Sequence, residues 1–275
     1  MRKDIQKIFV SAARFVNSYQ RTSLNGLGQI EITRVNLSLP RLGAAFHDYK
    51  LVQISDLHIG TWLNRSRLEG VVEMINREEP DLVAITGDFV TYDPDEFEED
   101  LVGALQKLEP RDSSVAILGN HDHWTDPVLI RRILHQSNVI DLSNHVLTLR
   151  RGEDSLHIAG VDDTMEKLDD LDFVLEQIPE EGAAILLAHE PDFARKSASS
   201  GRFDLQLSGH SHGGQIVLPL VGPPVLPPLG RKYPKGFYKI KDMHLYTNRG
   251  IGTTSIRLRI NCPPEIAVLA LQVLD

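Results

Sequence analysis

The segment at residues 208–215 contains two histidines, His210 and His212, separated by one serine and flanked by glycines. An alternating apolar pattern over residues 203–207 precedes them and predicts a strand that ends just before the pair. Side chains two positions apart in an extended chain point to the same side, so both imidazoles can face one metal ion or two adjacent ions. An exposed turn that contains two histidines by chance is the alternative, and further clusters must decide between the two.

Four further polar clusters have the same chemistry, and each directly follows an apolar run that predicts a strand. The runs are residues 51–54, 82–85, 115–118 and 185–188. The clusters behind them contain Asp56, His58, Asp88, Asn120, His121, Asp122 and His189. Because sites in open α/β sheets form beyond the carboxyl ends of the strands, five separate segments can meet there. This repetition argues against unrelated polar turns and predicts a shared metal site.

The types of ligand limit the metal chemistry. Imidazole and carboxylate groups without thiolate suit catalytic Mn, Fe or Zn better than structural zinc, and we expect Mn first. The candidate ligands are too many for one tetrahedral ion but suit two ions that share a carboxylate. Two divalent ions carry more positive charge than Asp56, Asp88 and a bridging hydroxide neutralise, which favours an anionic substrate. Because two adjacent ions can stabilise both the attacking and the leaving oxygen of a phosphoryl group, the pattern predicts phosphoester hydrolysis.

The elements that must position these clusters alternate between strand and helix early in the chain and are mostly strands later. Asn64 is a predicted N-cap, and Asp126 offers another, followed by proline at the first helical position. Helices are predicted at residues 64–78, 95–108, 126–136 and 167–177, with a short one after Pro191. One or two strands are predicted within residues 30–39, and others at residues 50–55, 82–86, 114–118, 145–150, 155–160, 183–188, 203–208, 214–218, 236–240, 243–247, 255–260 and 266–272. This order favours a sheet-containing core with helices outside.

Five motifs carry a family resemblance, and they are Asp56-x-His58, Gly87-Asp88, Gly119-Asn120-His121-Asp122, His189 and Gly209-His210-Ser211-His212. In this order they make the chain resemble the calcineurin-like metallophosphoesterases over about residues 49–271. The resemblance implies an α/β fold, a four-layer α/β/β/α sandwich of mixed sheets with helices outside. It also implies a dinuclear metal centre at the strand ends.

The resemblance also implies a role for each motif residue. The ligands of one ion would be Asp56, His58 and His212. The ligands of the second ion would be Asn120, His189 and His210, and Asp88 would bridge the two ions. His121 would bind no metal and would instead stabilise the transition state or protonate the leaving oxygen.

Two finer points concern the place of this sequence within the family. Thr91 stands where family members often have a second aspartate that orients the histidine matched by His121, a role that Asp122 or another acidic group could take over. The segments at residues 188–192, 208–215 and 261–266 resemble a bacterial phosphodiesterase branch. That branch includes membrane-associated hydrolases, among them a UDP-2,3-diacylglucosamine pyrophosphatase. The resemblance therefore implies a phosphodiester or pyrophosphate substrate and, in its narrowest form, a lipid-linked one.

Composition excludes several partners and compartments. The chain has 275 residues with an ordinary apolar content of 41%, enough for one large domain. Its net charge of −9 argues against nucleic-acid binding, and its single cysteine, Cys262, can form no internal disulfide. No apolar run approaches the roughly 18 residues of a membrane span, and the N-terminus is not a convincing signal peptide. We therefore expect a cytoplasmic protein.

Two segments nevertheless offer peripheral membrane contacts. Residues 1–24 are a predicted basic amphipathic segment ahead of a metallophosphoesterase domain at residues 25–275. Such a helix can lie on the cytoplasmic membrane face or pack on the protein itself, and both interpretations stay open. The apolar, proline-rich residues 216–229 can likewise face lipid or fold over the sheet. Three cations that suit anionic headgroups follow this segment, Arg231, Lys232 and Lys235.

Three residues outside the ligand set are candidates for substrate binding. His123 can line the substrate entrance or pack locally, and Arg249 and Arg257 can bind a second phosphate or stay solvent-facing. Alternative functions are a nuclease, a soluble cyclic or linear phosphodiesterase, and a non-enzymatic scaffold of the same fold. A nuclease would need a basic track, which this acidic chain lacks. A scaffold would be favoured if ligand residues were missing, but the sequence contains all of them.

Overall fold

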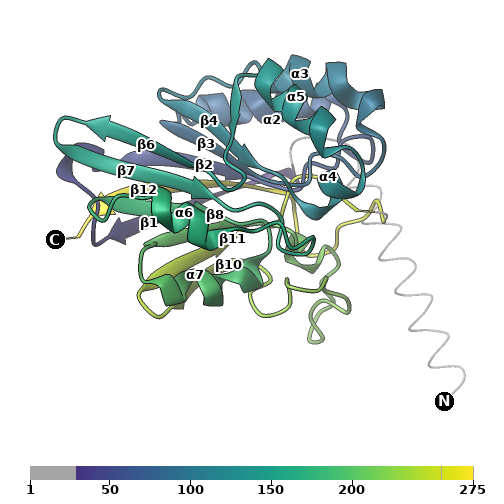
Figure 1. Ribbon diagram of the computed structural model, residues 1–275. Coiled ribbons are helices and arrows are strands. Elements are labelled where there is room, and N and C mark those ends of the chain that lie inside the picture. Colours follow the sequence, from purple (N-terminus) through teal and green to yellow (C-terminus); the bar gives the residue numbers. More distant parts are fainter. Residues whose placement is uncertain (1–28, 255, 275) are drawn as a thin grey trace, which may run out of the picture.

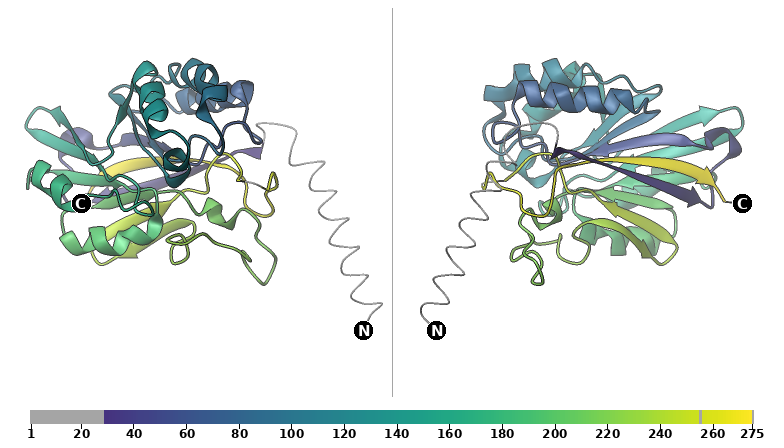
Figure 2. Two further views of the ribbon diagram at one scale, coloured as in Figure 1. Left: turned by 45° about the vertical axis from the view of Figure 1, so that its right-hand side comes forward. Right: turned by 180° about the vertical axis from the view of Figure 1, so that it is seen from behind.

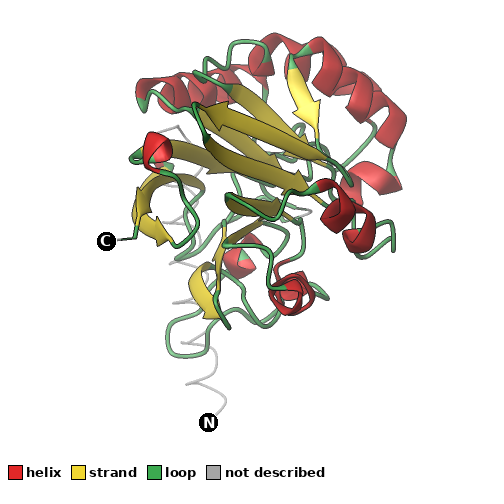
Figure 3. Ribbon diagram, turned by 60° about the vertical axis from the view of Figure 1, so that its left-hand side comes forward, coloured by secondary structure: helices red, strands yellow, loops and turns green. Residues whose placement is uncertain are grey.

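The computed structural model describes residues 29–254 and 256–274, which form two six-stranded sheets packed face to face (Figure 1). Helices cover the outer faces of both sheets, as Figure 3 shows from the side. This arrangement is the predicted four-layer α/β/β/α sandwich. The predicted amphipathic segment at residues 1–24 lies outside the described residues. Among the residues that are described, no helix is long and apolar enough to cross a bilayer.

The first sheet joins the beginning, the middle and the end of the described chain. Its strands, in spatial order, are β1 (Glu31–Leu39), β12 (Glu265–Val273), β2 (Tyr49–Ile54), β3 (Leu82–Thr86), β4 (Ser113–Ile117) and β5 (Val139–Asp141). Strands β2 to β5 run parallel, whereas β12 is parallel to β1 and antiparallel to β2. The last strand therefore lies between the first two, which Figure 2 shows from behind.

The second sheet comes from the later part of the chain and is also mixed. Its strands, in spatial order, are β10 (Gly236–Ile240), β11 (Met243–Thr247), β9 (Leu205–Ser208), β8 (Ala183–Leu187), β7 (Asp154–Gly160) and β6 (Val146–Arg151). Its four inner strands run parallel, and the two edge strands are antiparallel to their neighbours. Parallel inner strands put their carboxyl ends at one edge, where the sequence places its histidines.

Alternating side chains bind the four layers together. In β2, Leu51 belongs to the core between the sheets, whereas Val52 packs in the core under the helices. The helices over the first sheet are α2 (Arg65–Arg77), α3 (Glu98–Leu105) and α5 (Pro127–Gln136). Those over the second are α6 (Leu171–Gln177) and α7 (Ala194–Ser200). The central strands are apolar on both faces because both faces are covered.

The predicted caps are confirmed. The side chain of Asn64 accepts a hydrogen bond from the Arg67 backbone N–H at 3.0 Å and begins α2. Asp126 accepts from the backbone N–H groups of Val128 and Leu129 and begins α5, with Pro127 at the first helical position. Both caps satisfy donors that would otherwise lack partners at the helix ends.

Several predicted elements differ from the structure. Residues 214–218 and 256–260 form no regular strand, and their β pairing consists of isolated bridges from Ile216 to Ile260 and from Leu218 to Gly222. The alternation of apolar residues there comes from a loop whose backbone turns through positive φ at Gly214 and Gln215. The predicted helix at residues 95–108 divides into a 3₁₀ turn (Pro94–Phe97) and α3 because Phe97 has non-helical angles. The short elements that were not predicted include α4 (Asn120–Trp124), β5 and the 3₁₀ turns at Ala44–Phe46 and His212–Gly214.

Candidate metal centre

The polar segments that follow β2, β3, β4, β8 and β9 meet at one edge of the paired sheets. Their backbones turn sharply, and five residues have φ between 45° and 66°, namely Asp56, His58, Asp88, His210 and His212. This left-handed region costs a residue with a side chain roughly 1–2 kcal/mol. Surrounding structure must stabilise such turns, and their concentration at one place is typical of functional sites.

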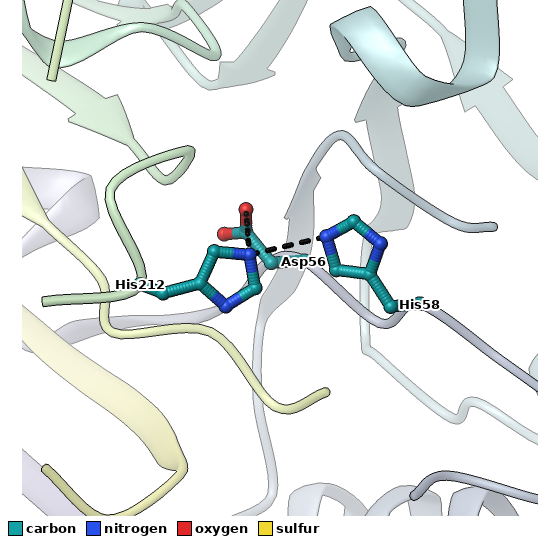
Figure 4. A group of neighbouring side chains, drawn as sticks. All are labelled: Asp56, His58 and His212. Atoms are coloured by element: carbon teal, nitrogen blue, oxygen red, sulfur yellow. Dashed lines mark hydrogen bonds and ion pairs between the residues drawn. The ribbon is translucent and has the colours of Figure 1, made fainter. Parts of the chain in front are cut away.

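Asp56, His58 and His212 form the first group of donor atoms (Figure 4). His58 Nε2 lies 3.1 Å from His212 Nε2, and His212 Nε2 lies 3.3 Å from Asp56 Oδ1. The Asp56 carboxylate also accepts the backbone N–H of His210 at 3.0 Å, which ties this group to the second histidine. Three buried donor atoms that point at one another offer a ready site for a cation.

Asp88, His189 and His210 form a second group, in which the donor atoms all lie within 4.8 Å of one another. Asp88 Oδ2 lies 3.3 Å from His189 Nε2 and 3.4 Å from His58 Nε2, so this carboxylate stands between the two groups. A carboxylate in that place can be shared by two ions. The structure therefore brings all seven predicted ligands to one edge, with Asp88 at their centre.

Each of three histidines keeps one ring nitrogen for the centre because the other already has a partner. His189 Nδ1 lies 2.6 Å from the Thr86 carbonyl oxygen, and His210 Nε2 lies 2.8 Å from that of Pro228. His58 Nδ1 lies 2.7 Å from the Thr91 hydroxyl. Such contacts fix the tautomer and orientation of metal-binding histidines.

Among the nine buried side-chain atoms of the described residues that lack a hydrogen-bond partner, two belong to the predicted ligands of the second ion. They are Asn120 Oδ1 and His189 Nε2. A buried polar atom without a partner loses its hydration without compensation, at a cost of about 1–3 kcal/mol. An ion bound there would satisfy both atoms, so the donor set fits a divalent metal ion.

Electrostatics keeps some of the donors in the state that metal binding needs, whereas burial raises the pKa of Asp56. Burial opposes ionisation of Asp88, but neighbouring His189 outweighs it and holds the pKa of Asp88 well below its usual range. Burial lowers the pKa of His210 to about 4, which keeps that imidazole neutral. Burial also disfavours charge on His189, but Asp88 and Asp56 outweigh this effect and raise its pKa. A metal ion at the same place would replace that proton.

His121 lies at the open side of the centre, on α4. Its backbone N–H donates to Asp88 Oδ1 at 2.9 Å, and its half-buried ring lies between those of His58 and Trp124, with centroids 4.8 Å from each. One of its ring nitrogens also lies within 4.8 Å of donors of His58 and Asp88. Burial lowers the pKa of His121, and the negative charge of Asp88 and a hydrogen bond to the Thr91 backbone partly oppose that shift.

Asp122 has a different role from the one considered from the sequence. Its buried carboxylate accepts the backbone N–H groups of Asp88, Phe89 and Gly119 at 2.8–2.9 Å. These bonds join the loops after β3 and β4, so the carboxylate holds the backbone of the bridging residue and does not orient the His121 ring. Burial raises the pKa of Asp122 to about 7.

The three residues predicted to bind substrate lie outside the pocket described below. His123 Nε2 is 2.7 Å from Asp162 Oδ1, so the ring packs locally. Arg249 forms ion pairs with Glu31 and the buried Glu265 at 2.9 and 3.0 Å. Arg257 is exposed. Arg259, on the same late segment as Arg257, is buried: it donates to the backbone carbonyls of Arg249, Gly250 and Gly252 and lies 3.4 Å from His212 Nδ1.

A cavity of about 380 Å³ opens directly onto the centre. Metal-site residues form one end of it, and these are Asp88, Asn120, His121, His210 and His212. Most of the remaining wall is apolar and comes from Trp124, Met165, Ile216, Pro224, Val225, Pro227, Pro228 and Ile256. Neither lysine nor arginine lines it. Five of these residues belong to the loop at residues 216–229, whose apolar character the sequence shows, whereas Trp124, Met165 and Ile256 come from other segments that no sequence signal joins to it.

A four-layer sandwich with carboxylates, imidazoles and an amide at its strand ends defines a metal-dependent hydrolase of phosphoesters. Residues 49–214, a range that contains every candidate ligand, match the calcineurin-like phosphoesterase family. The chain belongs to this family.

Similar proteins occur in bacteria and vertebrates. The uncharacterized metallophosphoesterase YkuE of Bacillus subtilis (strain 168) is 35% identical over 247 residues, which cover 88% of this chain and 86% of that protein. Phosphodiesterase YaeI of Escherichia coli (strain K12) is 29% identical over 253 residues, 89% of each chain. A transmembrane protein with metallophosphoesterase domain from Danio rerio is 31% identical over 256 residues, 88% of this chain but 57% of that protein.

Replacing Asp88 with Asn should leave the fold intact and sharply weaken metal binding. Asn has a similar shape and tolerates the left-handed backbone, but it removes the charge shared by the two groups of donors. The loss should exceed the roughly 10–100-fold that loss of an outer-shell partner costs. Mn²⁺ titration by calorimetry measures the affinity, and circular dichroism checks the fold. The exposed Asp48→Asn is the matched control. Unchanged Mn²⁺ binding in Asp88→Asn would contradict the assignment.

Proposed function

We propose that the protein hydrolyses a phosphodiester that carries an apolar group and that it uses two divalent ions, Mn first, with Fe or Zn as alternatives. The observation that carries this proposal is the position of the apolar cavity against the two groups of donors. A substrate that fills the cavity would place its phosphoryl group at the donor end. The apolar wall would then bind the remainder of the molecule.

The ligand assignment follows the two groups of donors. We assign one ion to Asp56, His58 and His212 and the other to Asn120, His189 and His210, with Asp88 between them. When bound, such ions supply positive charge that polarises the phosphoryl oxygens. The chain's own contribution is to hold the donors in one orientation through Thr86, Thr91 and Pro228.

We assign proton transfer to His121. Its ring lies at the cavity end of the centre, where a leaving oxygen would depart. Burial lowers the pKa of the ring, which makes the protonated form a stronger acid while reducing its population near neutral pH. Trp124 packs against the ring, and its Nε1 donates to Glu166 Oε1 at 2.7 Å, so the imidazole is supported on its open side.

The charge of the cavity favours a diester over substrates with further phosphates. A diester carries a single negative charge, which the ions would neutralise. A pyrophosphate or a nucleic-acid backbone presents additional charges, and no cationic side chain lines this cavity to receive them. The cavity therefore supports a phosphodiester more directly than UDP-2,3-diacylglucosamine, and it disfavours a nuclease.

Exposed apolar side chains beside the cavity support a lipid-bearing substrate met at a membrane surface. Leu220, Val221 and Val225 are 108%, 74% and 76% exposed, and they belong to one proline-rich loop. The exposed cations Arg231, Lys232 and Lys235 follow this loop. Apolar exposure next to cations suits an anionic lipid surface, at about 1 kcal/mol for each cation near it. These features support the proposal that the protein acts at the periphery of the cytoplasmic membrane face.

Replacing His121 with Ala should retain Mn²⁺ but lower turnover, by roughly 10²–10⁴-fold for an alcohol leaving group. The loss should be smaller for nitrophenol, which departs without protonation. Turnover of paired nitrophenyl and alkyl diesters measures this difference, and calorimetry checks the metal content. His135→Ala, an exposed position on α5, serves as the control. Equal losses for both leaving groups would reject proton transfer, and loss of Mn²⁺ would make His121 a ligand.

Longer alkyl chains on a nitrophenyl phosphodiester should raise kcat/KM, by up to about fourfold for each methylene that the cavity buries. Changing Val225 and Ile256 to Ser should reduce this dependence, because both line the cavity. Val128→Ser, which is 74% exposed on α5, should not change it. Chain-length profiles of kcat/KM for the three proteins measure the effect. A flat profile in the wild type would favour a small soluble diester.

Anionic liposomes should sediment the protein at low salt and release it at high salt, since screening weakens contacts between cations and headgroups. Changing Leu220 and Val221 to Ser should decrease the bound fraction. A truncation that removes residues 1–21 tests separately whether the basic N-terminal segment contributes. Retention of the full chain in the supernatant, with neutral and anionic vesicles alike, would argue against the membrane proposal.

A further inference from the structure

We infer that the backbone carbonyl of Pro228 positions His210, so that the wall of the apolar cavity and one set of metal ligands are coupled. The inference rests on the proposed role of His210 as a ligand. A carbonyl oxygen can only accept a hydrogen bond, so the 2.8 Å contact puts the ring proton of His210 on Nε2. Nδ1 then keeps its lone pair and faces the centre.

The position of this acceptor distinguishes His210 from His189. The partner of His189 is the carbonyl of Thr86, which lies at the end of a fully buried strand. Pro228, by contrast, is an exposed residue of the loop at residues 216–229, which contains no regular secondary structure. The orientation of His210 therefore depends on where a surface loop sits.

Two consecutive prolines make that loop a stiff support. The rings of Pro227 and Pro228 fix φ, and each proline also restricts the residue before it. The segment is tied down just beyond the prolines, where the carbonyl of Leu229 accepts the backbone N–H of Asp192 at 2.9 Å. The Asp192 side chain in turn accepts the backbone N–H of Lys232 at 3.0 Å. The loop thus holds the Pro228 carbonyl beside His210 with little conformational freedom.

The same prolines form part of the cavity wall together with His210. A ligand that fills the cavity would press on Pro227 and Pro228 and hold the Pro228 carbonyl against the His210 ring. Coupling between two binding events is reciprocal, so such a ligand should strengthen metal binding at the His210 set. The apolar part of the substrate would in this way help to order the metal site that acts on its phosphate.

The test compares the wild type with Pro227→Gly/Pro228→Gly and with Pro219→Gly. Pro219 is an exposed proline of the same loop that lies outside the cavity lining, so it makes a matched control. In the metal-free protein, ¹⁵N NMR of the imidazoles should show His210 protonated at Nε2 in the wild type and in the control. The double variant should show a mixture of both tautomers.

Calorimetric titration with Mn²⁺ should show one of two sites weakened in the double variant, on the order of 10-fold, with the other unchanged. Dibutyl phosphate should tighten that site more than dimethyl phosphate does in the wild type, because both carry the same charge and differ in apolar volume. The difference should shrink in the double variant. An unchanged tautomer together with unchanged Mn²⁺ affinities there would overturn the inference and leave the proposed function standing. Two intact Mn²⁺ sites in His210→Ala would instead remove the proposed ligand role itself.

Discussion

The crowding of lone pairs at the end of the two sheets is the constraint on which the rest of the site depends. His58 Nε2 and His212 Nε2 are 3.1 Å apart, and Asp88 Oδ2 lies within 3.4 Å of His58 and His189. Protons can relieve individual contacts of this kind, and the raised pKa of His189 beside Asp88 and Asp56, despite its burial, is such relief. No hydrogen-bond donor reaches Asn120 Oδ1, so this buried oxygen stays without a partner. Divalent ions would satisfy the whole set at once, because one cation accepts several lone pairs.

These donors are held together by loops whose backbone takes conformations that a regular strand or helix does not allow. The left-handed turns at Asp56, Asp88 and His212 aim side chains from different strands at one place, and the packed sheets below stabilise them. Close approach of the loops adds a second requirement. A side chain at Gly87 would come within 2.7 Å of the Gly119 backbone nitrogen, and the Asp122 carboxylate joins these same loops through three backbone N–H groups. The acidic residue beside the motif thus stabilises the frame of the site.

The sequence was sufficient to predict the candidate donor residues but not the structure of the segments around them. Asp56, Asp88 and His189 could be predicted because each is a polar residue directly behind an apolar run, a local pattern with a local meaning. The insertion of β12 between β1 and β2 could not, because periodicity does not encode the partner of a strand. The alternating pattern at residues 214–218 was misleading, since Gln215 organises that loop through its side chain, which donates to the Ile256 carbonyl at 2.6 Å. The ion pair of Arg249 with Glu265 could not be predicted from the sequence because it joins segments 16 residues apart.

An apolar wall next to a cluster of charges is physically coherent because each strengthens the effect of the other. Electrostatic attraction between ions and a phosphoryl group is screened by water, and a substrate that fills the cavity would exclude that water. The wall itself is costly while empty, as the exposure of Val225 and Ile256 indicates. Prolines suit this position because they present apolar surface on a restricted backbone, which lowers the conformational entropy that binding costs. With the proposed ligand set, the segment from His210 to Pro228 would supply both a metal donor and part of the surface that contacts the substrate.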